Sequence, residues 1–484
     1  TTTGDLNAFD DNLVKKETFF DGLGRNTETH TFETASSYII TKVEFGVSGR
    51  VTRTYNPYRS TSDETYGYTV TSYDGLARVI KTEAFDSADS STGSVITAYE
   101  GNKVLVTDEV GNRRMSRNNG VGNLTDVWEI KPSDSFTTTI TFATQTLNGY
   151  LSSYEYDPAN NLKKVTQGSQ PARLFNYDSL NRLKNTANPE NGTTLYDYDE
   201  NSNIKTKTDA RGVITTFEYD DVNRPLSKTH SDGTPTVTYS YDTATLGVGR
   251  LASVTSTAST YSNGSYDASG KVKTSTQLTD GVSYTMSYDY NRAGSLIRQT
   301  YPSGRIVNTE YDNALRIAGI KNGSGVYYAG AAPGDANAIQ YSTIGATSTM
   351  KFGNALWEHF TFNSRFQTTE IGLGTSSSDS SKLKLSYDYG LLVNGTPDPL
   401  KNNGNLQRQT ITAPGMVRVQ SYTYDELGRL LTATEKNGTT PTWAQFYKYD
   451  RFGNRRFDSG TTLPAIPPGS ENTINPEISG TNNR

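Results

Sequence analysis

Residues 177–183 read Tyr-Asp-Ser-Leu-Asn-Arg-Leu, and this pattern recurs along most of the chain. A fixed period is typical of repeat proteins, which grow by stacking units. We therefore predict one tandem array in place of the roughly three domains that the length suggests. Pairs of Tyr and Asp begin at Tyr156, Tyr177, Tyr198 and Tyr219, each 21 residues apart, then at Tyr241, Tyr266, Tyr288 and Tyr311 at steps of 22, 25, 22 and 23, and also at Tyr73, Tyr387, Tyr424 and Tyr449, with an aromatic variant at Phe20.

Other positions of the unit repeat as well. An aromatic residue often lies two before the Tyr, as in Tyr154 and Tyr156, which places both rings on one face of a strand. Asn or Gly tends to lie four after it, at Asn160, Asn181, Asn223, Gly270, Gly428 and Gly453. An apolar residue lies six after it, at Leu162, Leu183, Ile204, Val272, Ile317 and Leu430.

This order of residues predicts a β-hairpin. Asp accepts hydrogen bonds from turn amides, and Asn or Gly tolerates a positive φ. The apolar residue then begins a second strand. A Gly six to eight residues before the next Tyr marks a second turn, at Gly192, Gly212, Gly233, Gly281 and Gly304. Each repeat is therefore expected to contain two strands and two turns.

The length of the array predicts its shape. At about 22 residues per unit, the chain holds about 20 units and about 40 strands, which would make a flat sheet about 190 Å wide. Open twisted sheets rarely exceed about ten strands without curling. We predict an all-β fold in which Tyr-Asp hairpins form one continuous antiparallel sheet that spirals into a hollow shell. A stacked solenoid and a sheet folded flat on itself share the same local pattern.

Composition excludes several classes of protein. Hydrophobic residues make up 33% of the chain, yet it has 32 Tyr, so the apolar surface comes largely from Tyr rings. The net charge of −5 and the lack of long Lys/Arg clusters argue against a nucleic-acid binder. No cysteine occurs, which excludes disulfides and thiolate metal sites. The chain also contains no run of 18 apolar residues, so no membrane-spanning helix is predicted.

The repeat is irregular in some places. We predict a diverged unit at Phe362-Asn363, and the turn half of a unit at residues 108–113. Residues 322–338, 375–381 and 394–404 are expected to be longer loops. We expect the repeat wall to occupy residues 1–459, as a piece of a longer array. The Gly/Pro/Asn-rich residues 460–484 are expected to be extended or disordered.

Residues 177–183, 424–430 and 449–455 together resemble the consensus of the RHS/YD-repeat family. The resemblance covers most of residues 15–457 and implies a hollow β-shell. In bacterial RHS proteins and toxin-complex C components, such a shell encloses a C-terminal toxin; in teneurins it serves adhesion. Bacterial shells usually end in Asp-Pro-x-Gly motifs with an aspartate-dependent cleavage site. Asp157-Pro158 and Asp398-Pro399 lack the Gly, so no cleavage residues are carried over.

We predict no catalytic, cofactor-binding or metal-binding residues. His30, His230 and His359 are isolated in the sequence and have no partner at ligand spacing. The acidic residues 197–203 depart from a calcium loop at Ile204 and Ala210 and are better explained as a strand end and a turn. The Tyr rings are expected to pack between repeats, although an exposed subset such as Trp128, Trp357 or Trp443 would suit a ligand.

The resemblance favours a non-enzymatic shell segment of a secreted or surface bacterial protein. Its expected partners are flanking segments of the same polypeptide and an enclosed toxin domain. The alternative is an adhesion or carbohydrate-binding module that uses the outer wall and the loops 322–338 and 394–404, with surface glycans as partners. A third hypothesis is a polysaccharide lyase or hydrolase, which requires clustered acids in a groove. A glycan array would separate the second hypothesis from the first.

Overall fold

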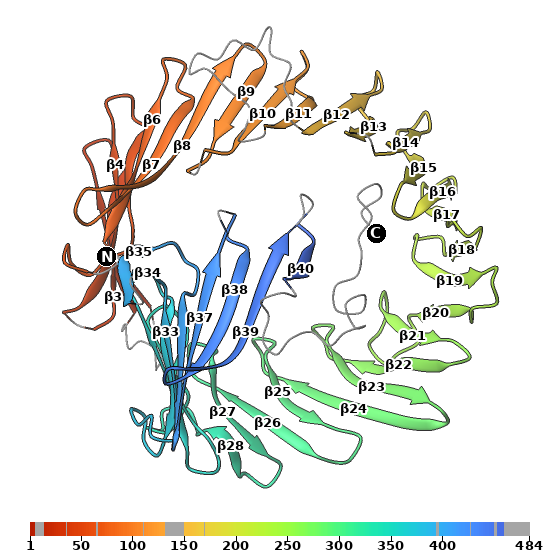
Figure 1. Ribbon diagram of the computed structural model, residues 1–484. Helices are drawn as coiled ribbons and strands as arrows, with labels where there is room; N and C mark the ends of the chain where they lie inside the picture. Colours follow the sequence, from red (N-terminus) through yellow and green to blue (C-terminus); the bar gives the residue numbers. More distant parts are fainter. Residues whose placement is uncertain are drawn as a thin grey trace.

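The structure is a computed structural model that describes residues 1–4, 14–34, 36–63, 66–109, 111–130, 150–168, 170–393, 396–425, 427–449 and 453–458. The described residues form 40 β-strands and no helix (Figure 1). The predicted all-β fold and the expected number of strands are therefore confirmed. Residues 460–484, predicted to be extended or disordered, lie outside the described residues.

The strands follow one another along the chain with short turns between them. The first eleven are β1 (Thr2–Gly4), β2 (Val14–Phe20), β3 (Asn26–Phe32), β4 (Tyr38–Phe45), β5 (Val51–Tyr55), β6 (Gly67–Tyr73), β7 (Val79–Asp86), β8 (Ser91–Glu100), β9 (Lys103–Thr107), β10 (Arg113–Asn118) and β11 (Leu124–Ile130).

The next seventeen strands contain the most regular repeats. They are β12 (Tyr150–Tyr156), β13 (Leu162–Gln167), β14 (Arg173–Tyr177), β15 (Leu183–Asn188), β16 (Gly192–Tyr198), β17 (Ile204–Thr208), β18 (Ile214–Tyr219), β19 (Pro225–His230), β20 (Val237–Tyr241), β21 (Leu251–Thr255), β22 (Ser259–Tyr266), β23 (Val272–Thr279), β24 (Val282–Tyr290), β25 (Leu296–Thr300), β26 (Ile306–Tyr311), β27 (Ile317–Asn322) and β28 (Tyr327–Gly330).

The last twelve strands belong to the C-terminal part. They are β29 (Gln340–Tyr341), β30 (Thr347–Lys351), β31 (Trp357–Phe362), β32 (Thr368–Gly374), β33 (Leu383–Asp388), β34 (Gly390–Val393), β35 (Thr396–Asn402), β36 (Arg408–Ala413), β37 (Met416–Tyr424), β38 (Leu430–Asn437), β39 (Thr440–Tyr449) and β40 (Arg455–Phe457).

Each strand from β1 to β28 pairs antiparallel with the next strand in sequence, which makes one sheet of 28 strands. A second sheet of ten strands runs from β29 to β40 and omits β34 and β35, which pair only with each other. A bridge between Ala329 and Phe352 joins the two sheets. We call the two sheets together the wall.

Many of the hairpins contain the same irregularity in strand register. Asn176 pairs with Asn185 and Tyr177 with Leu183, so Lys184 is an extra residue on its strand. The register shifts in the same way directly before Tyr156, Tyr198, Tyr219, Tyr241, Tyr290, Tyr311, Phe362 and Tyr424. A β-bulge bends its strand and increases the local twist. The repeat therefore carries its own source of curvature.

The wall is one layer thick, and burial within it is shallow. Ile39 and Ser364 are the largest side chains among the described residues with less than 2% of their surface exposed. A small cluster of Leu105, Met115 and Ile130 packs with Trp128 on one stretch of the sheet. Tyr and Thr cover one another along the strands, and most strand residues are half-buried. Stability therefore comes mainly from contacts between neighbouring strands.

Figure 1 shows the wall curling into a ring, with β33 and β37 on the side where the chain begins and β38–β40 inside the outline of the ring in this view. The hydrogen bond between Ser364 and Asp63 shows that the two ends touch. The predicted curling of the sheet is thus confirmed. The loop predictions for residues 322–338 and 394–404 are wrong. Strand β28 lies within the first range, and β34 and β35 form a hairpin around the second. Residues 375–381 do form a loop.

Candidate functional site: the tyrosine clamps and the seam

The aspartate of each repeat organises the turn that follows it. Asp178 Oδ1 accepts hydrogen bonds from the amides of Leu180 and Arg182, both at 2.9 Å, and its Oδ2 accepts Arg182 Nε at 2.8 Å. These bonds, led by the one from the Arg182 amide, lower the pKa of Asp178 although burial opposes them. The same arrangement recurs at Asp21, Asp74, Asp157 and Asp425, with Arg or Asn as the fourth residue on.

The predicted left-handed position is also confirmed. Asn181 has a φ of 61° and Asn223 one of 65°, and their amides donate to the carbonyl oxygens of Asp178 and Asp220. Asn and Gly tolerate this conformation at low cost, which explains their recurrence four residues after the Tyr. The apolar residue six after the Tyr begins the next strand, as Leu183 does for β15.

The tyrosine of most Tyr-Asp pairs fastens its strand to the previous repeat. Tyr198 donates its hydroxyl hydrogen to the carbonyl oxygen of Leu183 at 2.9 Å, and Tyr219 does the same to Ile204 at 3.0 Å. We call this contact the tyrosine clamp. It recurs at Tyr73, Tyr156, Tyr241, Tyr266, Tyr311, Tyr424 and Tyr449. Burial raises the pKa of Tyr198 and of Tyr219, so these hydroxyls keep the proton that they donate.

Basic side chains cover the clamped rings. The Arg182 guanidinium lies 4.7 Å from the centre of the Tyr198 ring, and Arg429 lies 4.4 Å from that of Tyr449. The Arg that completes one aspartate turn therefore packs on the tyrosine of the next repeat through a cation–π contact. This link between repeats leaves those ring faces covered, so they offer little surface for stacking on a sugar.

Two clamps differ from the Tyr-Asp pairs in the sequence. Tyr290 donates to the carbonyl oxygen of Val272 and Tyr389 to that of Thr368, so the clamping residues lie two after the predicted Tyr288 and Tyr387. Period-two alternation places Tyr288 and Tyr290 on the same face, and the sequence does not separate them. Tyr341 and Tyr99 also clamp, although neither precedes an Asp. Sequence reasoning missed both.

The diverged unit at Phe362-Asn363 is confirmed. Asn363 Oδ1 accepts the amides of Arg365 and Gln367, both at 3.0 Å, as the aspartate does elsewhere. Phe366 occupies the left-handed position with a φ of 62°. The turn half at Asp108 is confirmed as well, because the Asn112 amide donates to its side chain. The turn chemistry thus survives replacement of both motif residues.

The ends of the ring meet at a contact that we call the seam, formed by residues 56–63 and 362–367. Ser364 Oγ donates to Asp63 Oδ1 at 3.1 Å, and Ser364 has no exposed surface. Next to it, Arg365 Nη1 donates to the Asn402 carbonyl oxygen at 2.7 Å. Burial lowers the pKa of Arg365, and the nearby Asp63 partly offsets that effect. Residues 56–63 lie between β5 and β6, at the edge of the wall opposite the Tyr-Asp turns. Residues 362–367 form a turn at the Tyr-Asp edge, so the seam brings opposite edges of the wall together.

A cavity of about 660 Å³ lies beside the seam. Its lining is polar and includes Asp63, Ser364, Tyr387, Asp388 and Arg408. The Arg408 Nε donates to Asp388 Oδ2 at 2.7 Å. Sequence reasoning missed this site, since residues 301 positions apart in the chain carry no shared pattern.

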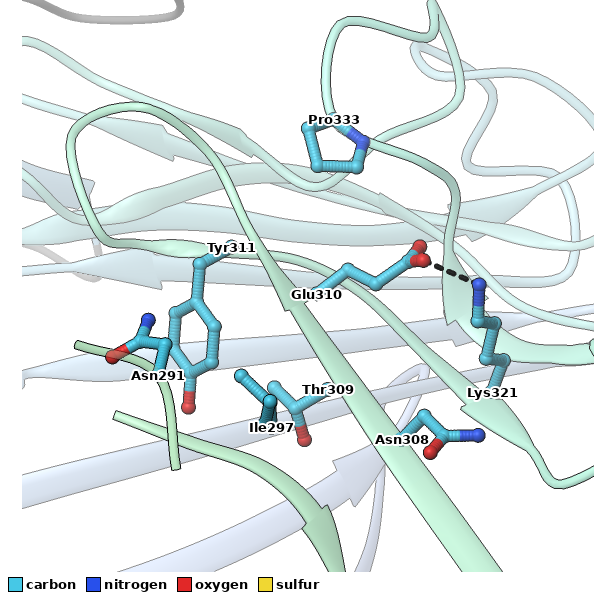
Figure 2. Close-up of a pocket in the computed structure, with 8 residues that line it drawn as sticks. All are labelled: Asn291, Ile297, Asn308, Thr309, Glu310, Tyr311, Lys321 and Pro333. Carbon is cyan, nitrogen blue, oxygen red and sulfur yellow. Dashed lines mark hydrogen bonds and ion pairs between the residues drawn. The ribbon is translucent and has the colours of Figure 1, made fainter. Parts of the chain in front are cut away.

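A second cavity, of about 450 Å³, lies at β26 and is lined by residues from both faces of that strand. In Figure 2, Tyr311 and Asn291 lie on one side of the strand and Glu310 and Lys321 on the other. Glu310 forms an ion pair with Lys321 and accepts the Tyr327 hydroxyl at 2.5 Å. Burial raises its pKa, but these two partners outweigh burial and keep the pKa below its ordinary value. The side chains do not converge on one point, which a catalytic site requires.

The remaining predicted candidates have local partners. His30 stacks on Tyr38 with ring centres 4.2 Å apart, and His230 contacts the Thr215 hydroxyl at 3.1 Å. The buried His359 lies 3.5 Å from Glu370. Asp199 organises a repeat turn by accepting the Asn203 amide. Among the described residues, no group of three or more His, Cys, Asp or Glu is arranged to hold a metal ion.

The tryptophans singled out in the sequence lie in strands. Arg117 lies 5.5 Å from the ring centre of Trp128, and Lys351 lies 5.6 Å from that of Trp357. Trp443 is half-buried on β39. Within the part of the chain that the structure describes, no helix has the length and apolar character needed to cross a membrane.

Comparison with known proteins gives two kinds of similarity. The RHS Repeat family model matches residues 177–214 and 198–235, the part of the wall with the most regular spacing. A search of curated protein sequences finds no match.

Several solved structures share the fold. A structure of the Photorhabdus luminescens Tc holotoxin pore, with a mutation in TccC3, is 16% identical over 93% of this chain with a TM-score of 0.65. A crystal structure of TcdB2-TccC3-TEV is 15% identical over 97% with a TM-score of 0.61, and TcdB2-TccC3 without its hypervariable C-terminal region is 15% identical over 97% with a TM-score of 0.60. This chain spans 26% of the first and 28% of the other two.

Proposed function

We propose that this chain, an RHS/YD-repeat protein, is a segment of a structural shell that encloses or presents a polypeptide cargo such as a toxin. Its role is that of a wall and not of an enzyme. The proposed partners are flanking segments of a longer polypeptide and the cargo itself. The proposed location is outside the cell or at its surface, because similar structures belong to a holotoxin.

The observation that carries this proposal is a long single-layer sheet closed into a ring. Its 28 first strands, at about 4.8 Å each, give a contour of about 130 Å and, if closed, a diameter of about 40 Å. Side chains of one layer reach about 5 Å inward, which leaves about 30 Å across the centre. Shallow burial along the strands supports the same view, since a second packed layer would bury one face.

The chemistry of the described carboxyl groups supports a non-enzymatic role. Hydrolysis of a glycosidic bond uses two carboxyl groups on either side of the bond, one with a raised pKa. Burial raises the pKa of Glu358, but the aspartates of the repeat turns have lowered pKa values because turn amides and Arg or Asn side chains bind them. Carboxylates held in this way serve structure. We therefore do not carry the hydrolase hypothesis further.

The carbohydrate-binding alternative depended on exposed aromatic rings and long loops, and it loses much of this support. Several clamped Tyr rings, such as those of Tyr198 and Tyr449, are covered by Arg side chains, and the two loops expected to bind glycans contain strands. A glycan array remains the direct measurement of this alternative, and we expect no binding.

Protection of a fused polypeptide tests the proposed function. A flexible reporter of about 60 residues with one protease site is fused to the C-terminus of the full chain. Enclosure predicts cleavage at least ten times slower than for the free reporter, because the protease is too large to enter the ring. Electron microscopy of the same protein is expected to show a hollow outline.

Two controls make this experiment specific. The same reporter fused to the N-terminus measures the effect of fusion alone. A fusion to an unrelated globular protein measures the effect of size. Equal cleavage rates for all three fusions, or a solid particle in the micrographs, would contradict the proposal.

A further inference from the structure

The seam joins parts of the chain that are far apart in sequence through a contact between side chains. Asp63 and Ser364 are separated by 301 residues, whereas strands elsewhere in the wall pair with their immediate neighbours. A hairpin such as β15–β16 has a ladder of paired strand residues together with a tyrosine clamp. At the seam, the hydrogen bond that links the two ends runs between two side chains. The seam is therefore a different class of contact from the rest of the wall.

Closing the seam buries polar groups at a cost. Ser364 has no exposed surface, and the Arg365 Nε is buried without a hydrogen-bond partner among the described residues. A buried donor that lacks an acceptor is unfavourable relative to the same donor in water. In a separated seam, water would solvate this guanidinium. The closed form thus carries a penalty that an open form would relieve.

Packing at the seam is also loose compared with the corner between the two sheets. The cavity of about 660 Å³ lies directly beside Asp63 and Ser364. At the corner, the backbone around Gly319 and Gly330 is so close that an added Cβ would lie 2.3 Å and 2.1 Å from carbonyl oxygens. Tyr341 clamps across this corner to Ile317. Dense packing and a clamp hold the corner together, whereas among the described residues no tyrosine clamp crosses the seam and a cavity lies beside it.

We propose that the seam is a latch, at which the ring opens and closes while both sheets stay folded. Opening separates residues 56–63 from residues 362–367 and gives access to the interior from the side. The hydrogen bond between Asp63 and Ser364 holds the closed form. This inference concerns the wall alone and does not depend on any cargo.

Distances across the seam test the latch directly, because the chain has no native cysteine and accepts spin labels at chosen sites. Labels at Thr61→Cys and Thr361→Cys, both exposed positions, lie on opposite sides of the seam. A reference pair, Thr61→Cys and Ala88→Cys, lies within the first sheet. Double electron–electron resonance then measures both distance distributions in the full chain.

Asp63→Ala is expected to at least double the population of molecules with a long distance across the seam and to leave the reference distance unchanged. Asp232→Ala is the matched control. Asp232 lies in a turn at the same edge of the wall as Asp63 but away from the seam, so this change is expected to alter neither distance. Joining Asp63→Cys to Ser364→Cys with a short thiol cross-linker is expected to abolish the long population.

Three outcomes would overturn the latch. The first is a cross-seam distance that Asp63→Ala leaves unchanged. The second is equal broadening of the reference pair, which would indicate unfolding of the sheet; circular dichroism of each variant detects this independently. The third is lengthening that appears only with dimer formation in mass photometry, because residues 56–63 would then bind a second copy.

Discussion

The regular repeats of residues 173–241 and the irregular stretch of residues 317–408 build the same wall in different ways. In the first, Tyr and Asp stand together every 21 or 22 residues, and a pair such as Tyr198-Asp199 supplies both a clamp and a turn. In the second, Tyr341 clamps beside a serine, Asn363 organises a turn beside a phenylalanine, and a hairpin is inserted at β34–β35. The tyrosine clamp and the turn can therefore occur independently of each other, although the Tyr-Asp motif usually supplies both.

Acid should distinguish the two stretches most strongly. Turn amides and side chains lower the pKa of the regular aspartates such as Asp178 and Asp199, so their ionised forms stabilise the fold above the unfolded value of about 3.9. That stabilisation is lost as the pH falls through the lowered folded-state pKa. Hydrogen exchange between pH 5 and pH 2 is expected to show the amides of Arg182 and Asn203 losing protection, while that of Gln367, bound to Asn363, keeps it.

The next largest effect is expected from removing a clamping ring. Tyr219→Ala removes the hydrogen bond to Ile204 and a half-buried ring, which should cost about 2–3 kcal/mol, below the range for fully buried aromatic residues. Local hydrogen exchange of β17 and β18 is the measurement, because repeat arrays need not unfold in one step. Val248→Ala, at an exposed turn position, is the control and should have no measurable effect. Equal loss of protection in both variants would contradict the clamp.

Backbone conformation gives a smaller effect with opposite signs at a turn of the regular stretch and at the turn that leads into the irregular stretch. Asn223→Val places a β-branched residue at a φ of 65° and should destabilise its turn by about 1–2 kcal/mol. Leu315 is a non-glycine residue at a φ of 61°, so Leu315→Gly should stabilise by about 0.5 kcal/mol after the entropy cost of glycine. Chemical denaturation of each variant gives the sign. Destabilisation by Leu315→Gly would show that its side chain matters more than its backbone.

The smallest effect concerns which tyrosine clamps. Tyr389→Phe removes a hydroxyl that donates to Thr368 and should cost about 1 kcal/mol. Tyr387→Phe, at the Tyr-Asp pair itself, should have little effect, since the described structure gives its hydroxyl no hydrogen bond. Local exchange of β32 and β33 compares the two variants. A larger loss for Tyr387→Phe would restore the sequence-based assignment.

Sequence was sufficient wherever local chemistry decides the structure. The turns at Asn160, Asn181 and Gly270 and the strand starts at Leu162 and Leu183 were all predicted, because a positive φ and period-two alternation leave clear patterns. The sequence does not show that Tyr290 clamps in place of Tyr288, because both rings lie on one face. The inserted hairpin at β34–β35 was mistaken for a loop, since its Pro and Asn residues are typical of turns.

The seam was beyond the reach of such reasoning. Whether Asp63 meets Ser364 depends on the summed bend of many hairpins between them, and a small change in each would separate the two residues. No short stretch of sequence encodes that sum. The same holds for the polar cavity beside the seam.

The extra residue found in many of the Tyr-Asp hairpins has a consequence for how such proteins vary in size. Where a repeat carries this bulge, as at Lys184 opposite Tyr177, the repeat contributes its own increment of bend. Duplicating or deleting whole repeats would then lengthen or shorten the arc while its radius stays the same. Gain or loss of repeats can therefore change the length of the spiral without a change in its diameter.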